Sequence, residues 1–130
     1  MVAHPNLATF NAIYIAFTTG DMDTLATFFN QEVVWHTPGH HPLAGTHEGR
    51  AATFASFAAE FERSGGSYGV EVREVLANDE HIVALLHATA DRGHKRLDQD
   101  YAIVFEMHAG SVQAAWEVWN DQASLDEFWA

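Results

Sequence analysis

Residues 68–119, YGVEVREVLANDEHIVALLHATADRGHKRLDQDYAIVFEMHAGSVQAAWEVW, are the stretch of this chain that decides its fold class. Four runs rich in β-branched and aromatic residues stand within it, at 68–76, 82–90, 97–107 and 112–119. Asn-Asp, Arg-Gly-His and Ala-Gly-Ser separate these runs, and such short connections are typical of hairpin turns. The pattern predicts a strongly curved antiparallel sheet of four strands in the C-terminal half.

The N-terminal half shows the three- to four-residue spacing of helices instead. It predicts a first helix that ends at Gly20 and a short second helix capped by Asp21. A third helix is predicted over 51–61, before the Ser-Gly-Gly-Ser breaker at 64–67. The apolar positions of the three helices are Leu7, Phe10, Tyr14 and Phe17, then Met22 and Leu25, then Ala51, Phe54, Ala55, Ala58 and Phe61.

One further strand is predicted at 33–35, Val-Val-Trp, and it ends where Pro38 and Gly39 interrupt a ladder. A loop follows up to Gly49, and residues 124–129 are expected to form one helical turn. Helical spacing in the first half and alternation in the second predict an α+β protein. With 130 residues and no linker or repeat, the chain is expected to form a single domain.

Composition argues against several classes of function. Eighteen acidic and six basic residues give a formal charge of -12, which would repel nucleic-acid phosphates and anionic membrane surfaces. The chain has no cysteine, which removes disulfides, thiolate metal sites and cysteine nucleophiles and fits a reducing compartment. Neither a basic-then-apolar leader nor a membrane-spanning run of about 18 apolar residues is present, so we expect a cytoplasmic protein.

Three short strings carry a resemblance to a known family. VWHTPG at 34–39, PLAGT at 42–46 and GR at 49–50 resemble the strand-loop-helix signature of SnoaL-like proteins, and residues 116–121 resemble their last strand. The order of elements resembles that of the nuclear-transport-factor-2-like superfamily, to which ketosteroid isomerases also belong. The resemblance covers nearly the whole chain, taken as one SnoaL-like domain over 1–130.

The resemblance implies a cone-shaped α+β barrel, with N-terminal helices packed in a strongly curved, mostly antiparallel sheet. It also implies an apolar pocket for a small organic molecule. The resemblance also implies a fold that is shared by isomerases, cyclases, dehydratases, epoxide hydrolases and non-catalytic binders. The activity therefore has to be inferred from the residues inside the cone.

Alternation divides the last strand into two faces. One face is apolar, and the other mixes polar and aromatic side chains, so composition alone would turn the mixed face to solvent. The resemblance reverses this, because it aligns Trp119 with the pocket-wall aromatic of ketosteroid isomerases. The apolar face would then bind a second subunit to form a homodimer. The apolar set is Val112, Ala114, Trp116 and Val118, and the mixed set is Gln113, Ala115, Glu117, Trp119 and Asp121.

Two carboxylates of the mixed face are candidate catalytic groups. By the resemblance, Asp121 stands where the aromatic-polyketide cyclases keep an acid/base aspartate, but an aspartate before a helical turn is equally well read as a helix cap. Glu117 would have a raised pKa, suited to proton transfer, if it faced a dry cavity. Glutamates on strands are more often exposed.

His36 is a third candidate, because an imidazole at the mouth of the cone could exchange protons near neutral pH. Its alternative role is to brace the loop. Whether Trp35 or His36 faces inward depends on a one-residue register that stays open. By the resemblance, Thr37 replaces the catalytic aspartate of ketosteroid isomerases, which argues against steroid isomerase activity.

Tyr101 is the fourth candidate, since the resemblance aligns it with the protonated aspartate that donates a hydrogen bond in ketosteroid isomerases. Ile13 falls at their other donor, a tyrosine, and Tyr14 lies one position away, so the complete oxyanion hole is not expected. The side chains expected to contact the substrate are Trp35, Trp119, Tyr14, Phe105 and Phe54.

Metal and cofactor sites are not expected. His36, His40, His41 and His47 surround one loop, but their spacing matches no zinc signature. There is no G-x-S-x-G nucleophile elbow, and Gly65-Gly66 precedes a predicted strand rather than a helix N-terminus. The chain is therefore expected to work without an organic cofactor.

Two classes of function remain. In the first, the chain is an enzyme in which Asp121, Glu117 or His36 moves a proton during isomerisation, cyclisation or dehydration of an apolar molecule. In the second, it is a binding or sensing module that uses the same Trp-lined pocket without chemistry.

Overall fold

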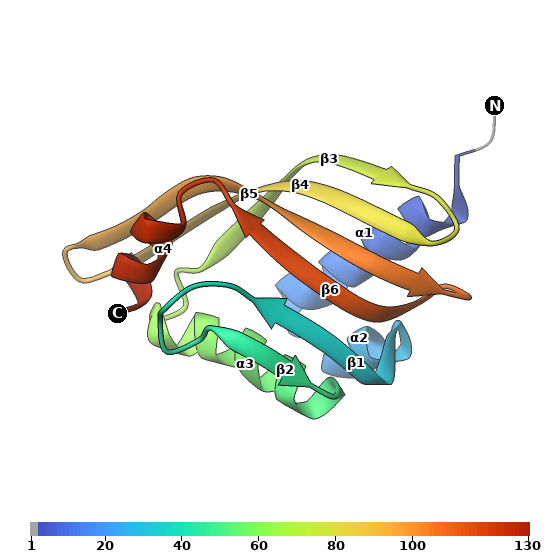
Figure 1. Ribbon diagram of the computed structural model, residues 1–130, viewed down its shortest axis with the longest axis horizontal. Helices are drawn as coiled ribbons and strands as arrows, with labels where there is room; N and C mark the ends of the chain where they lie inside the picture. Colours follow the sequence, from blue (N-terminus) through green and yellow to red (C-terminus); the bar gives the residue numbers. More distant parts are fainter. Residues whose placement is uncertain (1–2) are drawn as a thin grey trace.

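The computed structural model describes residues 3–130 as helices packed against one curved sheet (Figure 1). The α+β class is therefore confirmed. In chain order the elements are α1 (Pro5–Thr19), α2 (Met22–Thr27), β1 (Phe29–Thr37), β2 (Gly45–Glu48), α3 (Arg50–Arg63), β3 (Gly69–Ala77), β4 (His81–Arg92), β5 (Lys95–His108), β6 (Ser111–Trp119) and α4 (Gln122–Trp129).

The six strands lie in the order β2-β1-β6-β5-β4-β3. Consecutive pairs from β3 to β6 are antiparallel, which confirms the predicted meander of four strands. β1 pairs antiparallel with β2 and parallel with β6, so the sheet is mostly antiparallel. β2 and β3 form its two edges, and the sheet curves without closing into a barrel.

α1 and α3 cover the concave face of the sheet. α1 packs on β3 and β4, and α3 packs on β1 and β2, as Figure 1 shows. Aromatic side chains join the helices to the strands: Phe10 meets Phe105 at 5.9 Å between ring centroids, and Phe57 meets Trp35 at 4.8 Å. The core therefore lies between the helices and the sheet.

Several local predictions need correction. The loop predicted up to Gly49 contains the short edge strand β2, which pairs with β1. The buried side of α3 carries Thr53 and Phe57, whereas Ala51, Ala55 and Ala58 of the predicted stripe are exposed. Alanine is a weak marker of burial, because exposing its small side chain to water costs little free energy.

A β-bulge changes the predicted faces of β6. Met107 pairs with Val112 and Glu106 pairs with Ala114, so Gln113 is an extra residue in the ladder. An extra residue reverses the alternation on one side of it. Val112 is therefore fully buried instead of lying on the outer face, and the predicted faces hold only from Ala114 onward.

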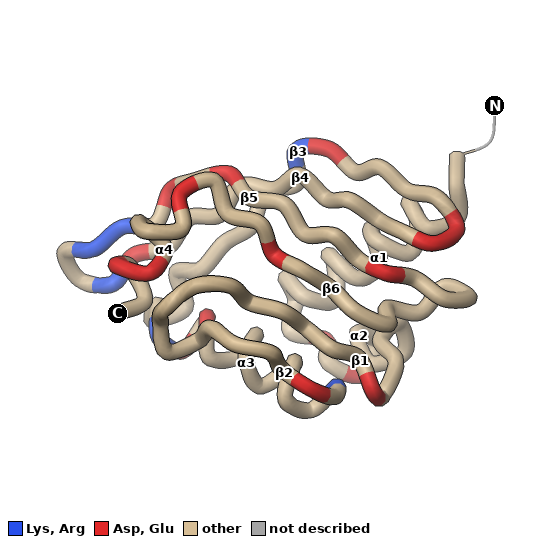
Figure 2. The backbone as a smooth tube through the Cα atoms, in the orientation of Figure 1, with Lys and Arg blue, Asp and Glu red and all other residues tan. Residues whose placement is uncertain are grey.

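Charge is distributed unevenly along the fold. Figure 2 shows acidic residues spread over most of the molecule, whereas basic residues are concentrated at the hairpin between β4 and β5, beside α4, with others on β3 and α3. There Arg92 donates hydrogen bonds to the carbonyl groups of Phe128 and Ala130, and the Lys95 ammonium donates to that of Glu127. The hairpin thus holds the C-terminal end of α4. Within residues 3–130, no helix has the length and apolarity needed to cross a membrane.

Candidate functional site

A cavity of about 60 Å³ lies between the helices and the concave face of the sheet. Its wall is almost entirely apolar and aromatic, and it takes side chains from the helices α1, α2 and α3 and from the strands β1, β3, β4, β5 and β6. Four polar groups, Glu60, Tyr68, Tyr101 and Glu117, interrupt this wall. The apolar residues are Phe10, Ile13, Tyr14, Phe17, Leu25, Phe29, Trp35, Phe57, Val70, Leu86, Ile103 and Phe105, with Tyr14 directing its hydroxyl to the Val70 carbonyl at 2.6 Å.

Glu117 of β6 is the polar centre of the wall. Its Oε2 accepts hydrogen bonds from Trp35 Nε1 at 2.6 Å and from Thr37 Oγ1 at 3.1 Å. Its Oε1 accepts one from Trp119 Nε1 at 2.8 Å. Burial raises the pKa of the Glu117 carboxyl, and these three donors oppose the rise because they stabilise the ionised form.

Glu60 of α3 faces the same cavity. Burial raises the pKa of Glu60 well above its usual range, the negative charge of Glu117 adds to the rise, and hydrogen bonding to Tyr68 opposes it. Two neighbouring carboxyl groups in an apolar site share their protons unequally. Since Glu117 has three donors, it is the first of the two carboxyl groups to ionise.

Tyr68 and Tyr101 complete the polar part of the cavity. Burial raises the pKa of both phenols well above the usual range, and the charges of Glu60 and Glu117 raise it further. Both hydroxyl groups therefore stay protonated and can donate hydrogen bonds. The Tyr101 ring stacks on Trp119 with centroids 3.9 Å apart and planes 2° from parallel, which fixes its orientation.

A second, smaller cavity of about 10 Å³ adjoins the same carboxylates. Glu60 and Glu117 border both cavities. The remaining wall of the smaller cavity comes from the end of β1 and the loop after it, from α3, from β6 and from α4, through Thr37, His41, Leu43, Ser56, Trp119, Leu125 and Trp129.

The structure brings most of the predicted site residues together. Glu117, Tyr101, Trp35, Tyr14 and Phe105 border the larger cavity, and Trp119 borders the smaller one. The open register of β1 is settled, because Trp35 faces inward. Phe54, predicted to contact substrate, packs instead behind the wall, with its ring 5.4 Å from that of Phe29 and 6.0 Å from that of Phe57.

Asp121 does not reach either cavity, so its predicted convergence with Glu117 is wrong. It is the N-cap of α4, where its Oδ1 accepts from the Ser124 amide at 3.0 Å and its Oδ2 from the Ser124 hydroxyl at 2.7 Å. These bonds lower the pKa of the exposed Asp121 carboxyl. The chain leaves the sheet after Trp119, so alternation no longer decides where residue 121 points.

His36 borders neither of these two cavities; it lines an open surface pocket together with Trp116 and Glu117. Trp35 faces inward, so the next residue of the strand faces outward. The His36 ring stacks on Trp116 of the neighbouring strand at 5.2 Å between centroids, on the outer face of the sheet.

Sequence reasoning missed Glu60, Tyr68 and His41. Glu60 follows Phe57 by three residues, which places it on the buried side of α3, and this spacing was a usable signal. Tyr68 precedes the first residue of β3, so no alternation assigned it to a face. His41 lies in an irregular loop, where sequence pattern does not predict direction.

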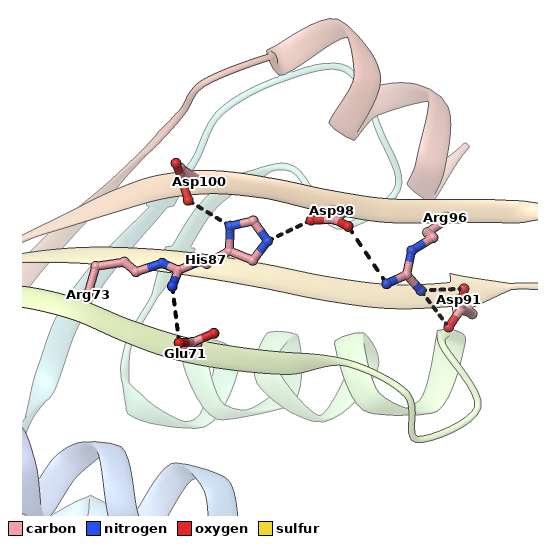
Figure 3. Close-up of polar contacts among 7 residues, drawn as sticks. All are labelled: Glu71, Arg73, His87, Asp91, Arg96, Asp98 and Asp100. Carbon is pink, nitrogen blue, oxygen red and sulfur yellow. Dashed lines mark hydrogen bonds and ion pairs between the residues drawn. The ribbon is translucent and has the colours of Figure 1, made fainter.

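Polar clusters outside the cavities have other roles. Within the described residues 3–130, no three His, Asp or Glu side chains are placed to hold a metal ion. The outer face carries His87 between two carboxylates, with Nδ1 2.6 Å from Asp100 and Nε2 2.6 Å from Asp98 (Figure 3). Both ring nitrogens thus face acceptors, and the pKa of His87 is raised by Asp100 and by Asp98.

Comparison with known proteins places this geometry in context. The sequence pattern of the SnoaL-like domain matches residues 10–115. The structure of Bal32a, from a soil-derived mobile gene cassette, is similar with a TM-score of 0.92 and 40% identity, covering 96% of each chain. No curated protein matches the chain.

Two more distant structures are similar in fold alone. TerC, co-crystallised with polyporic acid, gives a TM-score of 0.83 at 19% identity, covering 96% of this chain and 98% of TerC. An NTF2-like protein from Burkholderia xenovorans gives a TM-score of 0.80 at 22% identity, covering 96% of this chain and 95% of the other.

Proposed function

The chain belongs to the SnoaL-like domain family, and we propose that it is a cofactor-free acid/base enzyme acting on a small apolar organic molecule. The reaction class is isomerisation, cyclisation or dehydration. The observation that carries this proposal is the pair Glu60 and Glu117, two carboxyl groups on the wall of one largely apolar cavity. Paired carboxyl groups whose surroundings separate their pKa values are suited to act as acid and base.

Each polar group has a distinct part in the proposed reaction. Glu117, held ionised by Trp35, Trp119 and Thr37, removes a proton from a carbon next to a carbonyl or hydroxyl group. Glu60, held neutral by burial, returns a proton to another atom of the substrate. The Tyr101 hydroxyl donates a hydrogen bond to the substrate, supported by its stacking on Trp119.

The size of the cavity limits the substrate. An engineered cavity of about 150 Å³ accommodates benzene. The present cavity of about 60 Å³ is smaller. The substrate is therefore a compact apolar molecule, or the aromatic side chains of the wall move to admit it. The co-crystallisation of TerC with polyporic acid supports an organic ligand in this fold.

The alternative is a binding or sensing module without chemistry. One observation favours it: both oxygens of Glu117 already accept hydrogen bonds, so this carboxylate also fits a purely structural role. Enzyme and binder are separated by identifying, with mass spectrometry, the molecule that copurifies with the protein. Wild type should convert it, whereas Glu117→Gln and Glu60→Gln should bind it without turnover; binding with no conversion by wild type supports the module.

We also propose that the protein works as a homodimer through the outer face of the sheet. Trp116, Val118 and Leu85 are exposed there by 39%, 57% and 38%. Leu85, Ala102 and Val118 are neighbours in register across three strands, so they form a continuous apolar band. An exposed apolar band of this kind is suited to contact with a second copy of the chain.

A further inference from the structure

His41 presents a buried donor that the proposed reaction has not used. Its Nε2 is buried and makes no hydrogen bond to a protein atom. His41 borders the smaller cavity, whose wall also includes Glu60 and Glu117. A buried polar group without a partner costs free energy unless something else satisfies it.

The protonation of His41 follows from its neighbours. Nδ1 accepts a hydrogen bond from the Leu43 amide at 3.1 Å, so in the neutral ring the hydrogen is on Nε2. Burial lowers the pKa of His41, against the opposing effects of the Asp126 charge and the Pro38 carbonyl. At neutral pH the ring is therefore uncharged, and Nε2 carries the hydrogen that it can donate.

The smaller cavity has room for a single oxygen atom. A volume of about 10 Å³ approaches the minimum of about 10 to 15 Å³ that one water molecule needs. The two carboxyl groups border both cavities, so an oxygen atom in the smaller cavity lies beside the same carboxyl groups that face the larger one.

We propose that the smaller cavity is the oxygen subsite of the pocket, where the carbonyl oxygen of the substrate accepts a hydrogen bond from His41 Nε2. This inference rests on the proposed function and narrows the substrate to a carbonyl compound. Glu117 takes the proton as the bond between carbon and hydrogen breaks, and the electron pair moves to the carbonyl oxygen. A neutral imidazole donor stabilises that developing negative charge.

The test uses two probes of the same shape, cyclopentanone and methylenecyclopentane, which differ in having a carbonyl oxygen or a methylene group. Wild type should bind the ketone more tightly than the alkene in calorimetry. The infrared carbonyl stretch of the bound ketone should move to lower frequency, as expected for an oxygen that accepts a hydrogen bond. His41→Leu should abolish both the preference and the frequency shift, while alkene affinity stays unchanged.

Two control variants keep the result interpretable. His41→Gln retains an N–H donor at a similar reach and should restore the frequency shift. His40→Leu changes the exposed neighbouring residue, whose side chain does not border the smaller cavity, and should behave as wild type. If His41→Leu fails to fold, wild type and His41→Gln can still be compared. That comparison, together with a crystal structure of the ketone complex, decides whether the ketone oxygen accepts a hydrogen bond from residue 41.

The outcomes separate this inference from the proposed function. If neither probe binds, the proposed apolar pocket fails. If both bind equally to wild type, or the complex shows a water on Nε2 with the ketone oxygen elsewhere, the oxygen subsite is wrong while the pocket stands. A hydrogen bond from Nε2 to the Pro38 carbonyl in the complex also overturns the inference.

Discussion

Trp35 Nε1 donates a hydrogen bond of 2.6 Å to Oε2 of Glu117, and this contact joins β1 to β6 at the wall of the larger cavity. β1 and β6 lie next to each other and run parallel, with Trp35 opposite Ala115. The indole therefore reaches one side-chain position further along the same face. This bond, with that from Trp119, lets an ionised carboxylate exist among aromatic rings.

Replacing this donor should therefore weaken the folded state. Trp35→Phe keeps an aromatic ring but leaves Oε2 of Glu117 with one donor fewer, which should lower the free energy of unfolding by about 1 to 3 kcal/mol. It should also raise the pKa of Glu117 further. Urea unfolding and carboxyl titration by NMR measure the two effects. Trp116→Phe, which replaces an indole that makes no hydrogen bond to Glu117, is the control and should leave the pKa of Glu117 unchanged.

The burial of Glu60 should appear in the pH dependence of stability. Its pKa is higher in the folded than in the unfolded state, so its contribution is complete below the unfolded pKa of about 4.3 and is lost as pH rises through the folded value. The Glu60→Gln variant has no carboxyl group to ionise at this position. The unfolding free energy of this variant should therefore fall less with rising pH than that of wild type. Glu62→Gln, on the exposed side of α3, should follow wild type, and parallel profiles for all three proteins would contradict the burial of Glu60.

His87 should titrate above its ordinary value. Asp100 and Asp98 raise its pKa, so the stability it contributes is complete below the unfolded pKa of about 6.5 and is lost as pH rises through the folded one. Asp100→Asn and Asp98→Asn should each lower the pKa of His87 in an NMR titration of the ring protons. Asp79→Asn, which removes the partner of His4 instead, should leave it unchanged. A wild-type value at or below the ordinary pKa would show that the bridge does not form in solution.

The outer face provides a test of assembly. Wild type should sediment as a dimer at micromolar concentration, and Trp116→Glu should sediment as a monomer because it places a charge inside the apolar contact. Ile15→Glu is the matched control, since Ile15 is also an exposed apolar residue, at 51%, but lies on α1 away from this face. A monomeric wild type, or a dimer that Ile15→Glu disrupts, counts against this interface.

Local chemistry explains how much of the fold could be predicted. Gly-containing turns and alternating runs identified β3 to β6, because these signals act between neighbours in sequence. β2 was missed because Gly45–Glu48 is short, polar and at the edge, so it shows no apolar alternation. The bulge at Gln113 was missed because it depends on pairing with β5, which sequence periodicity does not contain.

The candidate site was predicted in part, from strand alternation combined with the family resemblance. Alternation grouped Glu117 with Trp119 on one face of β6, and the resemblance turned that face and Tyr101 toward the pocket. Asp121 and His41 lie outside regular strands, so their directions depend on tertiary contacts with α4 and with Leu43. Glu60 was missed, although its spacing from Phe57 indicated the buried side of α3, because the predicted apolar stripe ran through exposed alanines instead.

The most direct test of the proposed proton transfer is deuterium exchange into cyclopentanone in heavy water, followed by mass spectrometry. If Glu117 removes a proton next to the carbonyl group, wild type should accelerate exchange at the adjacent carbons by about 100-fold or more over buffer, the typical effect of a positioned base. Glu117→Gln should return the rate to that of buffer while still binding the ketone. Wild type that binds cyclopentanone without accelerating exchange, or a Glu117→Gln variant as fast as wild type, would contradict the account.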